Sequence, residues 1–229
     1  MNATGGEAAI VALTLQVGAA AMAVALPVAF LLAWLLARGR FPGKIVLDAL
    51  VHLPLVLPPV VTGWLLLIAF APDGPLGALL ARVGVSLIFR WTGAALAAAV
   101  MALPLMVRAI RLSIEAVDPR LEAAARTLGA GRWRVFWTIT VPLSLPGVLA
   151  ALVLGFARSI GEFGATITFV GNVPGETQTL PLAIYSALQS PDGEGTVTRL
   201  AVASIALALA ALVAAEWLAR RQGRGRHGV

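Results

Sequence analysis

The sequence lacks cysteine altogether and contains only two histidines, His52 and His227. The absence of cysteine excludes disulfide bonds, thiolate catalysis and sulfur-ligated metals. Because the two histidines lie far apart in the sequence, we expect no histidine-rich metal site. The sequence also shows no pattern of a nucleophile beside a base and no paired catalytic carboxylates, so it predicts no enzyme activity of its own.

Charged side chains are scarce, at 12% of the 229 residues, whereas a soluble domain carries about 25%. Hydrophobic residues make up 59% of the chain, and the mean hydropathy is +0.91. This balance indicates that lipid is the solvent, and the length suits one domain, residues 1–229. The net charge of +6 is also typical of nucleic-acid binding, but the basic residues flank apolar runs without a basic-aromatic platform. We therefore expect an all-α integral membrane protein in a lipid bilayer, with no nucleic-acid partner.

Five apolar stretches are long enough to cross a membrane. The first lacks the positive start of a signal peptide and is far longer than a signal core of about 7–15 residues, so we expect a permanent helix. Each span must be helical, because hydrocarbon offers no hydrogen-bond partner to the backbone. The predicted spans are roughly 8–37, 46–71, 92–107, 135–157 and 199–219.

The distribution of lysine and arginine predicts the orientation of the spans. With the N-terminus outside and the C-terminus inside, thirteen of the 17 basic residues fall in the cytoplasmic segments 38–45, 108–134 and 220–229. This asymmetry is the one that the positive-inside rule requires. The four others lie outside or near the outer boundary: Arg82, Arg90, Arg158 and Arg199.

Two further segments are unusual for a simple bundle. Pro54, Pro58 and Pro59 interrupt the second predicted span, and each removes a backbone donor. The outer segment 158–190 contains an apolar piece, residues 163–173, that is too short to span. Irregular backbone at membrane depth is tolerated where protein or a water-filled cavity covers it, so residues 158–190 are a candidate gate. The alternative is an outer cap without a role in transport.

The loop 118–134 predicts a short cytoplasmic helix. Asp118 is a good N-cap, Pro119 fits the first helical position, and Gly129 is placed to end the helix in the left-handed conformation. An apolar stripe follows helical spacing: Leu121, Ala124, Ala125 and Leu128. A helix with small residues can dock in a partner's groove, or it can lie on the lipid headgroups, and physical reasoning alone leaves both open.

A resemblance decides between these two readings. The loop resembles the EAA loop of ABC importer permeases. In that pattern three residues separate Glu-Ala-Ala from a glycine, and nine residues separate the glycine from Ile-x-Leu-Pro. Gly129 is here followed by nine residues and then by Ile139 to Pro142. The chain departs from the pattern at Glu122, which stands one residue early with Ala123 in its place, and at Val141, which replaces leucine.

Four longer segments resemble the permease subunits of molybdate importers in particular. They are residues 41–67, 101–122, 121–147 and 156–181, and within the last, GNVPGETQT at 171–179 favours molybdate. EFGA at 162–165 also occurs in sulfate and thiosulfate permeases, so these two cargoes, and tungstate, are the alternatives. The resemblance implies a type I importer permease in the bacterial inner membrane, acting as a homodimer with two cytoplasmic ATPase subunits and a periplasmic molybdate-binding protein.

Site residues follow from the resemblance and from the candidate gate. The resemblance implies that the coupling loop docks on the ATPase through Leu121, Glu122, Ala123, Ala124, Ala125, Leu128 and Gly129. Charge and hydrogen-bond donors for an oxyanion are expected from Arg158, Glu162, Thr166, Thr168 and Asn172. Arg158 is alternatively a simple ion-pair partner of Glu162 at i+4. Asp48 and His52 are also four residues apart and are expected to interact.

No nucleotide site is expected on this chain. The segment 39–45, GRFPGKI, resembles a phosphate-binding loop only loosely, because its glycines are too close and Ile45 replaces the hydroxyl residue that would hold Mg²⁺. ATP and magnesium are therefore expected on the partner ATPase, and no cofactor or metal on this chain. A secondary transporter remains the rival class, but it would need coupling-ion sites and internal repeats, and neither is seen.

Overall fold

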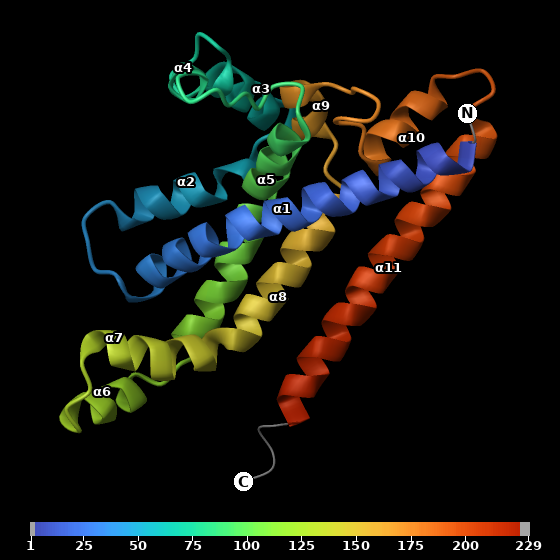
Figure 1. Cartoon of the computed structure of the whole chain (residues 1–229). Helices are drawn as coiled ribbons and strands as arrows, with labels where there is room; N and C mark the ends of the chain where they lie inside the picture. The colour runs from blue at the N-terminus through green and yellow to red at the C-terminus, as the bar shows by residue number, and fades with distance from the viewer. Residues whose placement is uncertain (1–2, 225–229) are drawn as a thin grey trace.

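The computed structural model describes the backbone of residues 3–224 and the side chains of residues 6–214. Within these ranges every regular element is helical (Figure 1). The basic tail predicted on the cytoplasmic side lies outside the described side chains. The all-α architecture predicted from the apolar runs is therefore confirmed for the described part of the chain.

Four helical runs in the described chain are long and apolar enough to cross a membrane. They are α1 (Ala3–Arg38), α5 (Trp91–Glu115), the continuous run of α7 (Arg132–Val135), η1 (Phe136–Thr140) and α8 (Val141–Ile160), and α11 (Glu194–Arg224). A bent pair of helices makes a fifth crossing when its two halves are taken together. This number agrees with the prediction of about five spans.

The second predicted span, 46–71, is not one helix. It consists of α2 (Lys44–Val56) and α3 (Pro59–Phe70), whose axes differ by 115°. Leu57 has an extended backbone, as residues before proline prefer, and Pro58 is extended as well. The paired prolines therefore break the helix, whereas Pro54 is accommodated inside α2. Residues 39–43 form the turn before α2. They belong to the segment 39–45, which loosely resembles a phosphate-binding loop.

Helix α5 is the centre of the bundle, and α1 and α8 pack along it. Its buried face is rich in alanine, including Ala94, Ala98 and Ala102. Small residues let membrane helices approach closely, which increases van der Waals contact where lipid offers no hydrophobic driving force. Gly155 of α8 uses the same device, because a Cβ there would lie 2.7 Å from the sulfur of Met106. These three helices thus form one tightly packed core.

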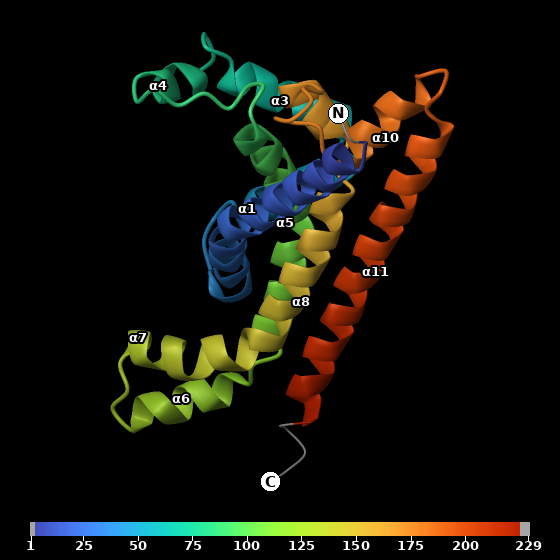
Figure 2. The ribbon, with the colours of Figure 1, turned by 45° about the vertical axis from the view of Figure 1, so that its right-hand side comes forward.

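The two ends of the molecule differ in character. One end holds the N-terminus, α3, α4 (Gly77–Ala81), α9 (Gly164–Val170) and α10 (Leu180–Leu188). The opposite end holds α6 (Pro119–Thr127) and α7, which project sideways from the long helices (Figure 2). The predicted loop 118–134 and the predicted outer segment 158–190 are therefore at opposite ends, as the topology from the positive residues requires.

A close backbone approach joins α3 to α9 at the first of these ends. A Cβ on Gly63 would lie 2.5 Å from the carbonyl oxygen of Ala165 and 2.9 Å from Thr168. Gly164 similarly faces the ring of Pro59. The outer half of the broken second span is therefore packed tightly against α9, because glycine alone leaves room for this contact.

We predict that Gly63→Ala lowers the stability of the folded chain by about 1–3 kcal/mol, because the methyl group must displace the backbone of α9. Thermal unfolding of the purified protein in detergent measures the effect. Gly161→Ala is the matched control at the same end, because a Cβ there meets only the Ala157 carbonyl oxygen at 4.0 Å. Equal unfolding temperatures for the two variants would contradict the proposed packing.

Candidate functional site: the projecting loop and its anchor

The loop between α5 and α7 folds as its sequence predicts. The Asp118 carboxylate accepts a hydrogen bond from the backbone N–H of Arg120 at 2.8 Å, and Pro119 occupies the first turn of α6. Gly129 has a φ of +85°, so it ends the helix in the left-handed conformation that glycine adopts without strain. The cap, the first-turn proline and the glycine stop are thus confirmed.

The outward face of α6 is apolar and uncovered in the described chain. Leu121 is 49% exposed and Leu128 is 89% exposed, and no residue of α6 is buried. Ala123, Ala124 and Gly129 are exposed as well, whereas Ala125 is partly buried. Apart from Ala125 and Glu122, the loop residues predicted to contact an ATPase therefore lie on an accessible surface.

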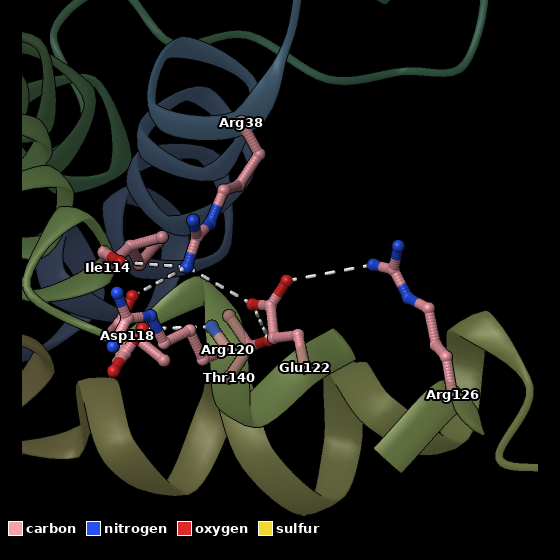
Figure 3. A network of polar contacts seen from close by, with 8 residues as sticks. Arg38, Ile114, Asp118, Arg120, Glu122, Arg126 and Thr140 are labelled. Atoms are coloured by element: carbon pink, nitrogen blue, oxygen red, sulfur yellow. Dashed lines mark hydrogen bonds and ion pairs between the residues drawn. The ribbon is translucent and has the colours of Figure 1, made fainter. Parts of the chain in front are cut away.

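Glu122 points the other way, towards the chain's own helices (Figure 3). Its side chain is only 14% exposed. Oε1 accepts hydrogen bonds from Nη2 of Arg38 at 3.1 Å and from Oγ1 of Thr140 at 2.9 Å. Oε2 lies 3.6 Å from Nη2 of Arg126, one turn along α6. The structure thus places Glu122 between α6 and the membrane helices rather than on the free surface.

Arg38 connects this carboxylate to two long helices. It is the last residue of α1, and its Nη2 also donates to the backbone oxygens of Ile114 at 3.3 Å and Val117 at 3.2 Å. Ile114 lies in the last turn of α5 and Val117 in the turn that follows it, and the last backbone oxygens of a helix have no partner within the helix. A cation at this position satisfies them and interacts favourably with the helix dipole.

Thr140 brings a third element into contact with Glu122. It is 3% exposed and is the last residue of η1, a π-helical segment between α7 and α8. π-Helical turns are rare and occur frequently at functional sites. We call Arg38, Glu122, Thr140 and the carbonyls of Ile114 and Val117 the Glu122 network. It joins α6 to the ends of α1 and α5 and to the start of α8.

This arrangement ties α6 to the membrane helices through ionic and hydrogen-bonding contacts. Ionic hydrogen bonds are about twice as strong as neutral ones, and breaking a partly buried pair leaves an unsatisfied charge. α6 is therefore bonded to the ends of the long helices rather than held by a free loop alone. The outward apolar stripe of α6 supplies the surface on which a partner would push.

The predicted gate residues lie together at the opposite end of the molecule, around α9. Arg158 pairs with Glu162, with Nη1 and Oε2 2.6 Å apart, so the i+4 pairing is confirmed. Oε1 of Glu162 accepts from the backbone N–H of Ala165 at 2.8 Å and thereby stabilises the start of α9. Glu162 is 3% exposed, so its charge serves this corner of the fold.

The three other predicted gate residues also bond within the fold or are buried. The hydroxyl of Thr168 donates to the Gly164 carbonyl at 2.9 Å, and Thr166 is 2% exposed. Asn172 donates through Nδ2 to Oγ of Ser186 at 2.6 Å, which ties the 171–179 loop to α10. A role for these side chains in contacting an anion stays a prediction.

Sequence reasoning missed Arg38 and Thr140 as parts of the site. Arg38 was explained fully by the positive-inside rule, and no local pattern links it to Glu122, which lies 84 residues further along. The expected interaction between Asp48 and His52 is confirmed, because Oδ1 and Nδ1 lie 3.2 Å apart. The same aspartate also pairs with Arg111, which the sequence did not indicate.

The sequence of this chain matches a protein family and known transport proteins. Residues 25–224 match the family described as binding-protein-dependent transport system inner membrane component. The chain is 56% identical over 229 residues to the molybdenum transport system permease protein ModB of Escherichia coli strain K12, covering 99% of this chain and all of that protein. It is 39% identical over 183 residues to the sulfate transport system permease protein CysT of the same strain, covering 80% of this chain and 65% of that protein.

Solved structures share the architecture at lower sequence identity. A bacterial alginate ABC transporter, crystallised in complex with an alginate pentasaccharide-bound periplasmic protein, superposes with a TM-score of 0.74 at 20% identity. The match covers 93% of this chain and 78% of that chain. At this identity the likeness concerns the fold.

We predict that Glu122→Ala loosens α6 from the membrane helices, because Arg38 and Thr140 lose their shared acceptor. The free energy of local opening falls by about 1–3 kcal/mol, which accelerates amide exchange in residues 119–128 roughly tenfold or more. Hydrogen–deuterium exchange with mass spectrometry of this segment makes the measurement.

Arg126→Gln is the control for this prediction. The Arg126 side chain is 55% exposed, and exposed ion pairs contribute about 0–1 kcal/mol. We expect its exchange to stay close to that of the native chain. Native-like protection of α6 in Glu122→Ala would refute the anchoring role of the network.

Proposed function

The chain belongs to the family of binding-protein-dependent transport system inner membrane components, and from this premise we propose that it is the permease subunit of an ATP-driven molybdate importer. The observation that carries the cargo is the 56% identity to a molybdenum permease over the full length of both chains. The helices that are long enough to cross a membrane and the inner-membrane family place the chain in a bacterial inner membrane.

The proposed partners bind at the two ends of this subunit. We infer that two copies pair, that two cytoplasmic ATPase subunits dock on the outward faces of their α6 helices, and that a periplasmic protein delivers the anion at the other end. The exposed stripe of Leu121 and Leu128 supports the ATPase contact, because a short apolar helix face fits a groove on a partner. Glu122 is assigned a positioning role behind this surface.

Energy for transport is supplied by the partner in this proposal. ATP and magnesium bind to the ATPase subunits, and this chain converts their movement into a change of its spans. ATP binding draws the two α6 helices together, and the Glu122 network carries this displacement to α1, α5 and α8. The pathway alternates between inward and outward access, and ATP binds preferentially to the outward-open assembly, because a ligand shifts an equilibrium only through differential affinity.

Sulfate is the second candidate cargo. The observation that favours it is the 39% identity to a sulfate permease over 183 residues. This relative is more distant than the molybdenum permease, and the match covers 65% of its length. Tungstate, a tetrahedral dianion like molybdate, is not separated from molybdate by these comparisons.

Uptake of labelled molybdate tests the proposal in cells that lack the gene and in cells to which it has been restored. We predict that the native gene restores uptake in the presence of excess sulfate. Uptake abolished by a modest excess of sulfate would reassign the cargo to sulfate. Equal uptake with and without the gene would refute molybdate import by this chain.

Gly129→Asp tests the coupling loop in the same cells. Aspartate tolerates the φ of +85° less well than glycine and adds a charge beside the docking stripe, so we predict loss of most uptake with normal membrane insertion. Gly84→Asp is the matched control, because Gly84 has a φ of +72° with no neighbour within 4 Å of a Cβ but lies between α4 and α5, far from α6. Equal uptake by the two variants would count against the loop.

A further inference from the structure

A cavity of about 550 Å³ lies between α2 and the second half of α5. The two helices line it with stripes of the same spacing. Ile45, Asp48 and His52 face it from α2, and Arg108, Arg111 and Glu115 face it from α5. Each stripe follows one helical face, because its members are separated by three, four or seven residues.

One ion pair joins the two stripes, and further contacts lie within each stripe. Nη1 of Arg111 lies 3.1 Å from Oδ2 of Asp48, and Nε of Arg111 lies 2.8 Å from Oε1 of Glu115. Nδ1 of His52 also lies 2.8 Å from the backbone oxygen of Asp48. Arg111 therefore donates to two carboxylates, of which Asp48 joins α2 to α5 and Glu115 lies on α5 itself.

The location of this charged surface requires water or protein beside it. α5 is a membrane-spanning helix, and ionisable groups on such helices face the interior of a bundle or a water-filled cavity. The side chains of Asp48 and Glu115 are 38% and 42% exposed in the single chain, however. The cavity between α2 and α5 leaves room for water beside this charged surface.

Arg108 is the guanidinium of the cavity that remains available to an anion. Among residues 6–214 no carboxylate lies within ion-pair distance of Arg108, and its side chain is exposed. A guanidinium offers paired N–H donors that match the geometry of an oxyanion. The carboxylates of Asp48 and Glu115 balance the two guanidiniums of the cavity, so the lining has no net formal charge, and an anion is held weakly and can leave.

The cavity is also placed where movement of α6 would reach it. Arg111 and Glu115 flank Ile114, whose carbonyl is bound by Arg38 in the Glu122 network. A displacement of the inner end of α5 therefore changes the Arg111–Asp48 contact and with it the separation of α2 from α5. The cavity and the anchor of α6 share the last turn of the same helix.

We propose that this cavity is the inner vestibule of the translocation pathway, and that Arg108 binds the departing oxyanion there. The proposal rests on the proposed function and deepens it by assigning the exit side of the path. It places the exit contact on α5 at the inner end, apart from the predicted gate around α9.

A single introduced thiol tests the vestibule, because the native chain has no cysteine. Ala49→Cys places the thiol on the exposed lining of the cavity, and Leu112→Cys places it on the opposite wall. The permease–ATPase complex in inside-out vesicles is treated with a charged, membrane-impermeant thiol reagent, and the mass of this subunit is measured. We expect labelling at both positions and slower labelling in the presence of molybdate.

Two controls separate access from anion binding. Leu209→Cys, on the 56% exposed apolar face of α11, is expected to stay unlabelled because it faces hydrocarbon. In the Ala49→Cys background, Arg108→Gln is expected to abolish protection by molybdate while labelling persists. Arg40→Gln, an exposed arginine in the turn before α2, is expected to retain the protection.

The outcomes distinguish this inference from the proposed function. Unlabelled thiols at both positions 49 and 112 would overturn the vestibule, and protection that survives Arg108→Gln would overturn the role of Arg108. Either result with normal molybdate uptake by the native chain leaves the import function standing. If the native chain takes up sulfate instead, sulfate replaces molybdate as the protecting anion, and lack of protection by sulfate would overturn the site.

Discussion

The contact between Arg38 and Glu122 is the constraint on which the inner end of this molecule depends. It joins a residue that ends α1 to a residue of α6 that follows 84 positions later, and the same guanidinium donates to the backbone oxygens of Ile114 and Val117 at the end of α5 and in the turn after it. Apart from this contact, α6 is connected to the spans by its two flanking turns, by the hydrogen bond from Thr140 and by packing against α7 and η1. With the carboxylate in place, the projecting helix and three spans meet at one partly buried ionic point, where a neutral replacement would remove the charge that pairs with Arg38.

Close packing in the rest of the fold connects the Glu122 network to the other helices. Alanines along α5 and glycines on α8 bring the central helices into close contact, and closely packed elements move as a body instead of deforming. At the outer end, Gly63 and Gly164 hold the broken second span against α9. The bend at Pro58 separates the part of that span locked to α9 from the part paired with α5. The two halves are therefore attached to different ends of the same central helix, which lets the inner half follow α6 while the outer half follows α9.

The sequence predicts the helices of this chain better than the contacts between them. Apolar runs locate the spans, and Asp118, Pro119 and Gly129 locate α6, because these signals act within one turn of helix. The prolines predict an interruption of the second span, but the size of the 115° bend depends on how α3 packs against α9. The inward orientation of Glu122 was missed, since the resemblance associates this position with a partner protein and nothing local identifies Arg38 as its neighbour. The facing stripes of α2 and α5 were missed for the same reason: each is a short periodic pattern whose meaning depends on the rotation of the other helix.

The charge balance of the cavity between α2 and α5 explains why these stripes combine arginines with carboxylates. A purely basic surface in a low-dielectric setting would bind a dianion tightly and hold it, since electrostatic attraction strengthens as water is excluded. The carboxylates of Asp48 and Glu115 offset that attraction, and Asp48 at the same time ties α2 to α5 through Arg111. Arg108, without a carboxylate within reach in the described chain, then provides a single contact for the anion. A conduit needs this combination, because a site on the exit side must attract its cargo enough to admit it and too little to retain it.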